Sequence, residues 1–172
     1  RVRAEYPISL HPMLFAGMKR LVDYQDTAYA HEYLDRLATL HARDAACDGE
    51  AQGYAFTEVA AKYLAVAMAY DDVIRVADLK TRASRFRRVQ AEVGVSDTQI
   101  LYTTEYMHPR MEEVVGFLPA SLGRAIESRP GLYKALDRLV NRGRRVRTGT
   151  VSWFVTLYAL GRMSRLRRRS LR

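Results

Sequence analysis

Cysteine is almost absent from this sequence of 172 residues, which contains only Cys47. A single cysteine cannot form an internal disulfide, which excludes a disulfide-stapled secreted fold. It also cannot ligate an iron–sulfur cluster, because such a cluster needs about four thiolates. Cys47 lies beside Asp48 and near Glu50, and their negative charges disfavour a reactive thiolate. We therefore predict a protein of a reducing compartment, the cytoplasm.

Long apolar runs and targeting signals are also missing. The longest apolar stretch, residues 151–160, contains Ser152 and Thr156 and is about half the length of a membrane span. The first residues lack the charged, apolar and small-residue regions of a signal peptide, and residue 1 is arginine. We expect a fragment of a longer intracellular chain, in which residues 1–12 form a connector interrupted by Pro7 and Pro12.

Complete catalytic motifs are the third absence. No glycine-rich phosphate loop and no G-x-S-x-G nucleophile turn occurs in the sequence. Residues 31–35, HEYLD, begin like the helix of a zinc protease, but Asp35 stands where the second histidine is required. Because a zinc site needs at least three protein ligands, we interpret this segment as an exposed helix face with a Glu32–Arg36 ion pair. We predict no catalytic residue, no metal and no bound cofactor in this chain.

Positive charge is abundant but unevenly distributed. The formal net charge is +9, yet residues 121–172 hold 14 of the 28 lysines and arginines and only two acidic residues. This asymmetry predicts an anionic partner, which is nucleic acid, a membrane surface or an acidic protein. The best candidate anion site is the loop 143–150, which leads into a helix start near Thr148 or Thr150 and contains Arg144, Arg145 and Arg147. The alternative is a basic loop paired with carboxylates of residues 1–120, in which acidic residues outnumber basic ones by 17 to 14.

Apolar residues recur at helical spacing in the first half of the chain. Their steps of three and four predict two long helices, over residues 14–40 and 58–93, joined by a loop that contains Gly49 and Gly53. We expect these helices to pack antiparallel. The facing stripes are Leu21, Gln25, Tyr29, Tyr33 and Leu37 against Val59, Tyr63, Val66, Tyr70 and Ile74.

The second half of the chain is more broken. Residues 95–110 include QILYTTEY, whose β-branched and aromatic residues predict an irregular or short extended segment. Pro119, Pro130 and Gly143 then separate shorter helices at 111–117, 120–128, 132–141 and 150–166. The predicted fold is all-α: one helical domain with a long antiparallel hairpin over 13–94 and a basic helical tail over 111–172, which complete a bundle.

Three segments carry a family resemblance: residues 20–37, 60–94 and 143–163. The pairs Tyr24-Gln25 and Tyr29-Ala30 and the run from Ala69 to Leu79 contribute most of it. The sequence resembles the C-terminal helical region of indolepyruvate:ferredoxin oxidoreductase β-subunit-like proteins. The resemblance implies a parent enzyme that oxidatively decarboxylates arylpyruvates to acyl-CoA and reduces ferredoxin. Thiamine diphosphate and iron–sulfur clusters are then expected on other domains or subunits, and no family catalytic residue falls in this chain.

Two functional hypotheses follow. The first is a non-catalytic accessory or docking domain that contacts a partner subunit of this oligomeric oxidoreductase, with Arg144, Arg145 and Arg147 as candidate contacts to CoA phosphates. The second is a basic module that binds nucleic acid or an anionic membrane through its terminal arginines, Arg165, Arg167, Arg168, Arg169 and Arg172. If Trp153 is exposed in the isolated chain, we expect it to mark the surface of a missing partner.

Overall fold

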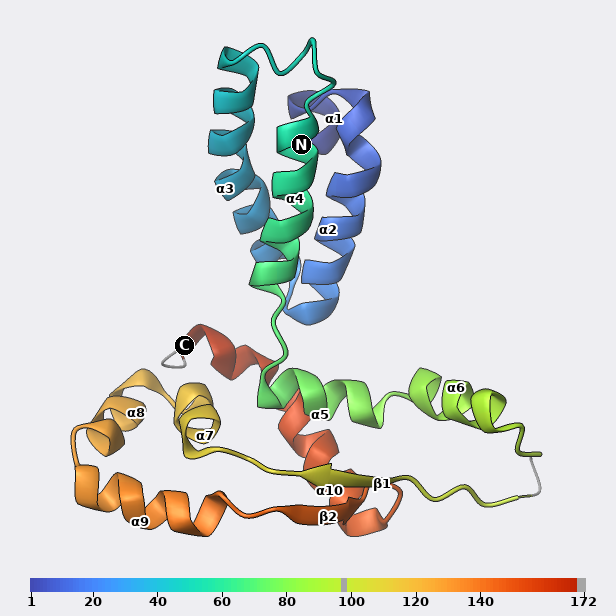
Figure 1. The fold of residues 1–172 in the computed structure, drawn as a ribbon, viewed down its shortest axis with the longest axis vertical. Coiled ribbons are helices and arrows are strands. Elements are labelled where there is room, and N and C mark those ends of the chain that lie inside the picture. Colours follow the sequence, from blue (N-terminus) through green and yellow to red (C-terminus); the bar gives the residue numbers. More distant parts are fainter. Residues whose placement is uncertain (97–98, 170–172) are drawn as a thin grey trace. The chain divides into compact units, whose positions relative to one another are not determined.

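The computed structural model describes residues 1–96 and 99–169, and most of these residues are helical (Figure 1). The predicted all-α class is confirmed, with one small two-stranded sheet added to it in the described part of the chain. The chain divides into two compact units, Arg1–Tyr70 and Asp71–Arg172.

The N-terminal unit is a bundle of three helices that pack side by side. They are α2 (His11–Tyr24), α3 (Thr27–Ala46) and α4 (Ala55–Met68), preceded by α1 (Val2–Glu5) and a 3₁₀ turn, Ile8–Leu10 (Figure 1). Residues 1–70 are all described, and the buried centre of the bundle is continuous from α1 to α4. Its members include Leu10, Leu14, Leu21, Tyr33, Leu34, Leu37, Ala61 and Ala65.

The sequence predicted a connector over residues 1–12, and this prediction is wrong. Val2, Tyr6 and Leu10 are buried in the bundle, and the Tyr6 hydroxyl donates to the Leu34 carbonyl oxygen at 3.2 Å. Pro12 lies in the first turn of α2, where a missing amide N–H costs no helical hydrogen bond. The prolines therefore mark a helix start and do not prevent the segment from packing.

The predicted long helix over 14–40 is interrupted at Gln25 and Asp26. Gln25 is the C-cap of α2, with φ −134° and ψ −80°, so the helix does not continue through it as predicted. Asp26 is extended, and its side chain accepts a hydrogen bond from the Tyr29 amide at 2.8 Å. This N-cap starts α3 afresh, while the apolar period continues across the break.

The predicted helix over 58–93 is likewise divided, into α4, α5 (Val73–Thr81) and α6 (Ala83–Val93). The Asp72 side chain accepts from the Arg75 amide and caps α5, and Arg82 is extended between α5 and α6. The antiparallel hairpin survives as α3 and α4. The loop between them places Asp48, Gly53 and Tyr54 at positive φ.

The C-terminal unit contains the predicted short helices, with bounds that differ by a few residues. Helix α5 packs against α10 (Val151–Gly161), and a second cluster forms around Met111, Val115 and Ile126. The other elements are α7 (Met111–Phe117), α8 (Ala120–Glu127), α9 (Pro130–Val140), the 3₁₀ helix Arg162–Arg169, and the strands β1 (Thr104–Met107) and β2 (Arg144–Arg147). Strand β1 confirms the extended segment, whereas β2 replaces part of a predicted loop.

Tyr33 occupies the centre of the N-terminal bundle. Its side chain is fully buried, and its hydroxyl donates to the carbonyl oxygen of Ala61 at 3.1 Å. A Cβ atom added to Gly17 would lie 2.8 Å from the Tyr33 hydroxyl oxygen and 3.2 Å from the Ala65 Cβ. The ring therefore needs a glycine at position 17, and the Ala65 side chain packs close to the same point.

We predict that Gly17→Ala destabilises the bundle. Overpacking costs about 1–3 kcal/mol, and the contact of 2.8 Å with Tyr33 places Gly17→Ala in the upper part of that range, above the gain of about 1 kcal/mol in helix propensity. Gly131→Ala in α9 is the matched control, because no atom lies within 4 Å of the added Cβ. Urea unfolding measures both variants. Equal stability of the two variants would contradict the close approach.

A second prediction concerns alkaline pH. Burial raises the pKa of Tyr33 well above its ordinary value of about 10. Above that pH the unfolded chain loses this proton while the folded chain keeps it, so the free energy of unfolding falls as pH rises. Tyr33→Phe removes the contribution, and its unfolding free energy should fall less steeply between pH of about 9 and 11. Parallel pH profiles for the two proteins would refute this.

Candidate functional site

Helix α4 has apolar side chains on two faces. Its charged residues are limited to Glu58 and Lys62, and its buried face consists of Thr57, Ala61, Ala65 and Met68. We call the opposite face the α4 outer face. It consists of Phe56, Val59, Tyr63, Val66 and Tyr70, each of which is between 47% and 62% exposed. A helix that is apolar around its circumference is normally covered on all sides.

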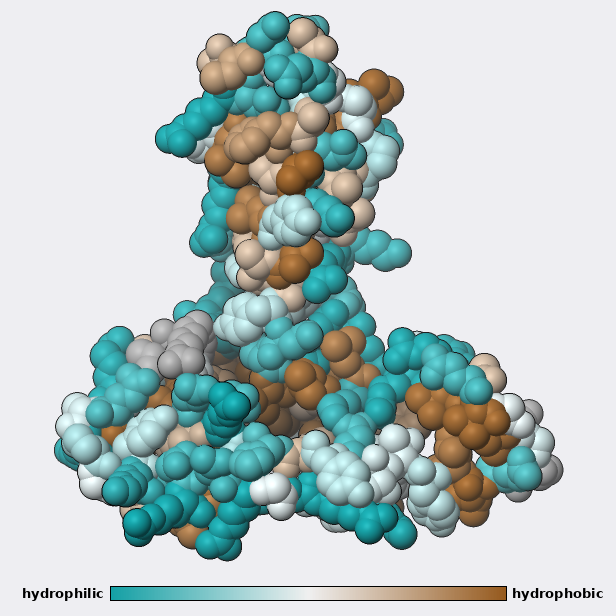
Figure 2. Space-filling model, viewed as in Figure 1, coloured by the Kyte–Doolittle hydropathy of each residue, from teal (hydrophilic) through white to brown (hydrophobic). Residues whose placement is uncertain are grey.

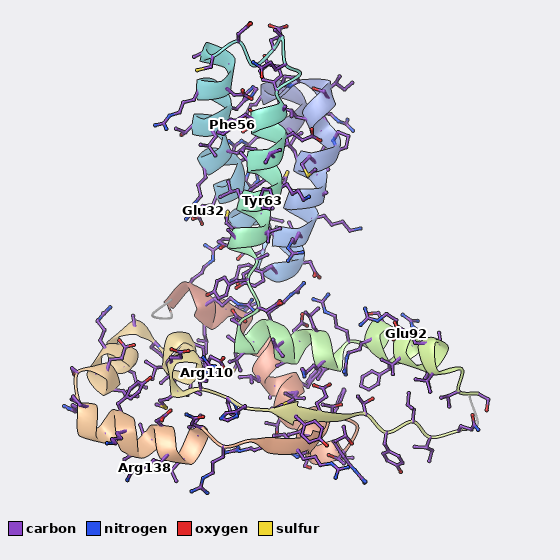
Figure 3. All side chains as sticks on the ribbon, viewed as in Figure 1. Glu32, Phe56, Tyr63, Glu92, Arg110 and Arg138 are labelled. Carbon is purple, nitrogen blue, oxygen red and sulfur yellow. The ribbon has the colours of Figure 1, made fainter. Side chains whose placement is uncertain are left out.

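The spacing on the α4 outer face is that of a helix-packing seam. The residues from Phe56 to Val66 follow each other in steps of three and four, which aligns them along one side of α4. Tyr70 comes just after the helix ends at Met68, and its ring centre lies 6.0 Å from that of Tyr24. Figure 2 shows apolar side chains on the visible face of the N-terminal unit, and Phe56 and Tyr63 are labelled along α4 in Figure 3. A contiguous apolar row of this kind is typical of an interaction surface.

This face corrects the predicted pairing of the two stripes. Of the first stripe, Leu21, Tyr33 and Leu37 are buried as predicted. The prediction that the second stripe is buried is wrong. Its residues in the N-terminal unit are about half exposed: Val59, Tyr63, Val66 and Tyr70. Ile74 is buried, but in the C-terminal unit. Alanines face the bundle instead, because only a small-residue face leaves room for the Tyr33 ring.

A second surface lies on the ribbon formed by β1 and β2. The strands pair antiparallel, with Thr104 opposite Arg147 and Tyr106 opposite Arg145. Side chains directly opposite each other share a face, so these four residues lie on one side of the ribbon. Tyr102 joins them, since the Arg147 guanidinium lies 5.6 Å from the centre of its ring. We call this set the ribbon outer face.

The other side of the ribbon is anchored to the unit. Val146 is buried, and the opposite residue Glu105 forms ion pairs with Lys80 of α5 and Arg85 of α6. Burial, with a smaller effect of the Arg85 charge, lowers the pKa of Lys80. Glu105 is the one acidic residue of the two strands, both of which are wholly described, so no strand carboxylate neutralises the ribbon outer face.

The three arginines predicted as an anion site do not converge. Arg145 and Arg147 share the ribbon outer face. Arg144 alternates to the other side of the strand, and its side chain donates to the Leu139 carbonyl oxygen at 3.3 Å. Helix α10 begins after Thr150, as predicted. Sequence reasoning missed Tyr102 and Tyr106, although their alternation within an extended segment was the signal that could have found them.

The terminal arginines are divided among different environments. Arg167 forms an ion pair with Asp72 within the C-terminal unit, so this arginine is not free to bind an external anion. The side chain of Arg169 and the whole of Arg172 lie outside the described residues. Trp153 is half-buried on α10, while Val151 and Val155 beside it are exposed.

The HEYLD segment forms local ion pairs. Glu32 pairs with Arg36, as predicted, and Asp35 pairs with Arg1 at 2.8 Å. Across residues 1–96 and 99–169, no group of three His, Cys, Asp or Glu side chains is arranged to hold a metal ion. In that same part of the chain, none of the helices has the length and apolarity that crossing a membrane requires.

Comparison with known proteins identifies one family. A family model described as "Family of unknown function (DUF6537)" matches residues 10–172. No curated protein and no solved structure matches the chain. The matched range spans both compact units, so the two units occur together in the family.

We predict that Glu105 holds the ribbon in place. Glu105→Gln leaves Lys80 and Arg85 as neighbouring, mostly buried cations, and should destabilise the C-terminal unit by about 1–3 kcal/mol. Hydrogen exchange at the β1 amides should accelerate. The control is Glu92→Gln, whose exposed pair with Arg88 should change stability by at most about 0.5 kcal/mol. Unchanged β1 exchange in Glu105→Gln would contradict the anchoring role.

Proposed function

The chain belongs to the DUF6537 family, and we propose that it is a non-catalytic docking domain of an indolepyruvate (2-oxoacid):ferredoxin oxidoreductase. The α4 outer face is the observation that carries the proposal, since it is an apolar seam that the other helices of the N-terminal unit do not cover. The resemblance over residues 20–37, 60–94 and 143–163 supplies the parent enzyme. In this proposal, thiamine diphosphate and iron–sulfur clusters belong to other domains or subunits, and ferredoxin accepts electrons there.

The size of the α4 outer face suits attachment within a larger assembly. Full burial of a large apolar side chain contributes about 1.5–3 kcal/mol relative to full exposure. The five residues are already about half buried, so covering them contributes on the order of 5 kcal/mol in total. Free association loses about 4–15 kcal/mol of translational and rotational freedom. A face of this size therefore docks best when other contacts already hold its partner close.

The residues that flank the seam favour a different protein over a second copy. Ala60 and Ala67 lie along one side of it, and Lys62 lies along the other. A symmetric antiparallel pair of α4 helices centred on Tyr63 would bring the two Lys62 side chains together, which is unfavourable. Small flanking residues instead admit a broad apolar surface. We therefore assign the face to the catalytic partner subunit of the oxidoreductase.

Co-expression with the thiamine diphosphate-binding subunit tests the proposal. The wild-type chain should co-purify with that subunit, and the double variant Val59→Glu/Tyr63→Glu should reduce the recovered complex at least tenfold. Both positions are exposed, so the free variant should lose no more than about 0.5 kcal/mol of stability per substitution. Leu122→Glu/Leu139→Glu, at exposed apolar positions in the C-terminal unit, is the control and should bind normally.

Two outcomes would contradict this function. One is a wild-type chain that fails to bind the subunit, or a seam variant that binds as well as the control. The other is a wild-type chain that sediments as a dimer through this face and becomes monomeric on Val59→Glu substitution. That result would assign the α4 outer face to a second copy of the chain.

A further inference from the structure

We infer that the ribbon outer face binds a phosphorylated nucleotide, with a base stacked on Tyr102 or Tyr106 and phosphate held by Arg147 or Arg145. This inference does not rest on the docking role, because the ribbon lies in the C-terminal unit and the α4 outer face in the N-terminal one. It begins from the pairing of two tyrosines with two arginines along one side of a two-stranded sheet.

Tyrosine and arginine occur together at two places along the ribbon. Arg147 lies against the Tyr102 ring, and Arg145 is directly opposite Tyr106 in the ladder. The Thr148 amide donates to the Thr103 carbonyl oxygen at 3.2 Å, which extends the pairing toward Tyr102. The two pairs are built differently, because Tyr102 precedes the strand and meets Arg147 diagonally, whereas Tyr106 and Arg145 are directly opposite each other within the ladder. Each pair places an aromatic ring and an arginine on the same side of the ribbon.

Exposure shows that the fold does not use these rings for packing. Tyr106 is 82% exposed and Tyr102 is 61% exposed, whereas the other face of the ribbon buries Val146 and pairs Glu105. Arg145 and Arg147 are exposed as well. Because Glu105 is used on the inner side, the positive potential of the outer side is left for an external anion.

The combination of groups selects the class of ligand. Aromatic rings stack on bases of any sequence, and guanidinium groups bind phosphate through two parallel hydrogen bonds. An anionic membrane would instead require apolar side chains able to enter it, and the ribbon outer face offers Thr104 and two tyrosines. An acidic protein would engage the arginines but has no need of the rings. A ligand with both a base and a phosphate uses every group present.

The nucleotide has two possible sources, which the probes separate. Coenzyme A carries a phosphorylated adenosine, pantetheine is the same thiol arm without the nucleotide, and a twelve-residue oligothymidine supplies the repeating unit of a single strand. Binding of each to the 172-residue chain is measured by calorimetry at low and high salt. We expect coenzyme A, the oligonucleotide or both to bind, with affinity that falls as salt rises, and pantetheine not to bind.

Variants then assign the site. Arg145→Ala/Arg147→Ala and Tyr106→Ala/Tyr102→Ala should each weaken binding at least tenfold, while Tyr106→Phe/Tyr102→Phe should retain it because the rings remain. Arg144→Ala is the matched control, since this arginine belongs to the same strand but lies on the other side of the ribbon. Binding of coenzyme A alone would identify a free nucleotide as the ligand, and binding of the oligonucleotide would identify a single strand.

Three results would overturn the inference. They are no binding of either nucleotide probe, binding that the arginine variant retains as fully as Arg144→Ala does, and binding that depends on the arginines but not on the tyrosine rings. The last would describe a simple anion site. The docking variant Val59→Glu/Tyr63→Glu should leave nucleotide binding unchanged, so failure of the nucleotide site and failure of the docking role are distinguishable.

Discussion

The buried ring of Tyr33 determines how the N-terminal unit is built. It lies against Gly17 of α2, where an added Cβ would clash with its hydroxyl, and it donates a hydrogen bond to the Ala61 carbonyl oxygen on the small-residue face of α4. Once this face of α4 is directed inward, the larger apolar side chains of the same helix must lie on the outside. The α4 outer face is therefore a direct consequence of how the core is packed, and the proposed docking role follows from that packing.

Hydrophobic periodicity was sufficient to predict the helical class, the buried stripe of α3 and the short helices of the C-terminal unit. It could not show the breaks at Asp26 and Asp72, because each depends on one side chain that caps a new helix while the apolar period continues across it. It also could not choose between the two apolar faces of α4. Hydrophobicity favours the larger residues, but complementarity of volume with Tyr33 selects the alanines.

The candidate nucleotide site shows the same division. Local charge was enough to single out Arg145 and Arg147, but their aromatic neighbours come from a segment about forty residues earlier in the sequence. Only the register of β1 against β2 places Tyr106 opposite Arg145 and sends Arg144 to the other side. Register is set by turn geometry and by which face is buried, and neither can be read from the composition of one strand.

The central claim is that the α4 outer face is left open by the N-terminal unit and is covered in the enzyme. Hydroxyl-radical footprinting tests it most directly, with Tyr63 and Tyr33 as exposed and buried tyrosines of the same bundle. In the isolated chain Tyr63 should be oxidised far faster than Tyr33, and in the complex with the thiamine diphosphate-binding subunit its oxidation should fall to the level of Tyr33. Equal protection of both tyrosines in the isolated chain, or an unchanged rate at Tyr63 in the complex, would contradict the account.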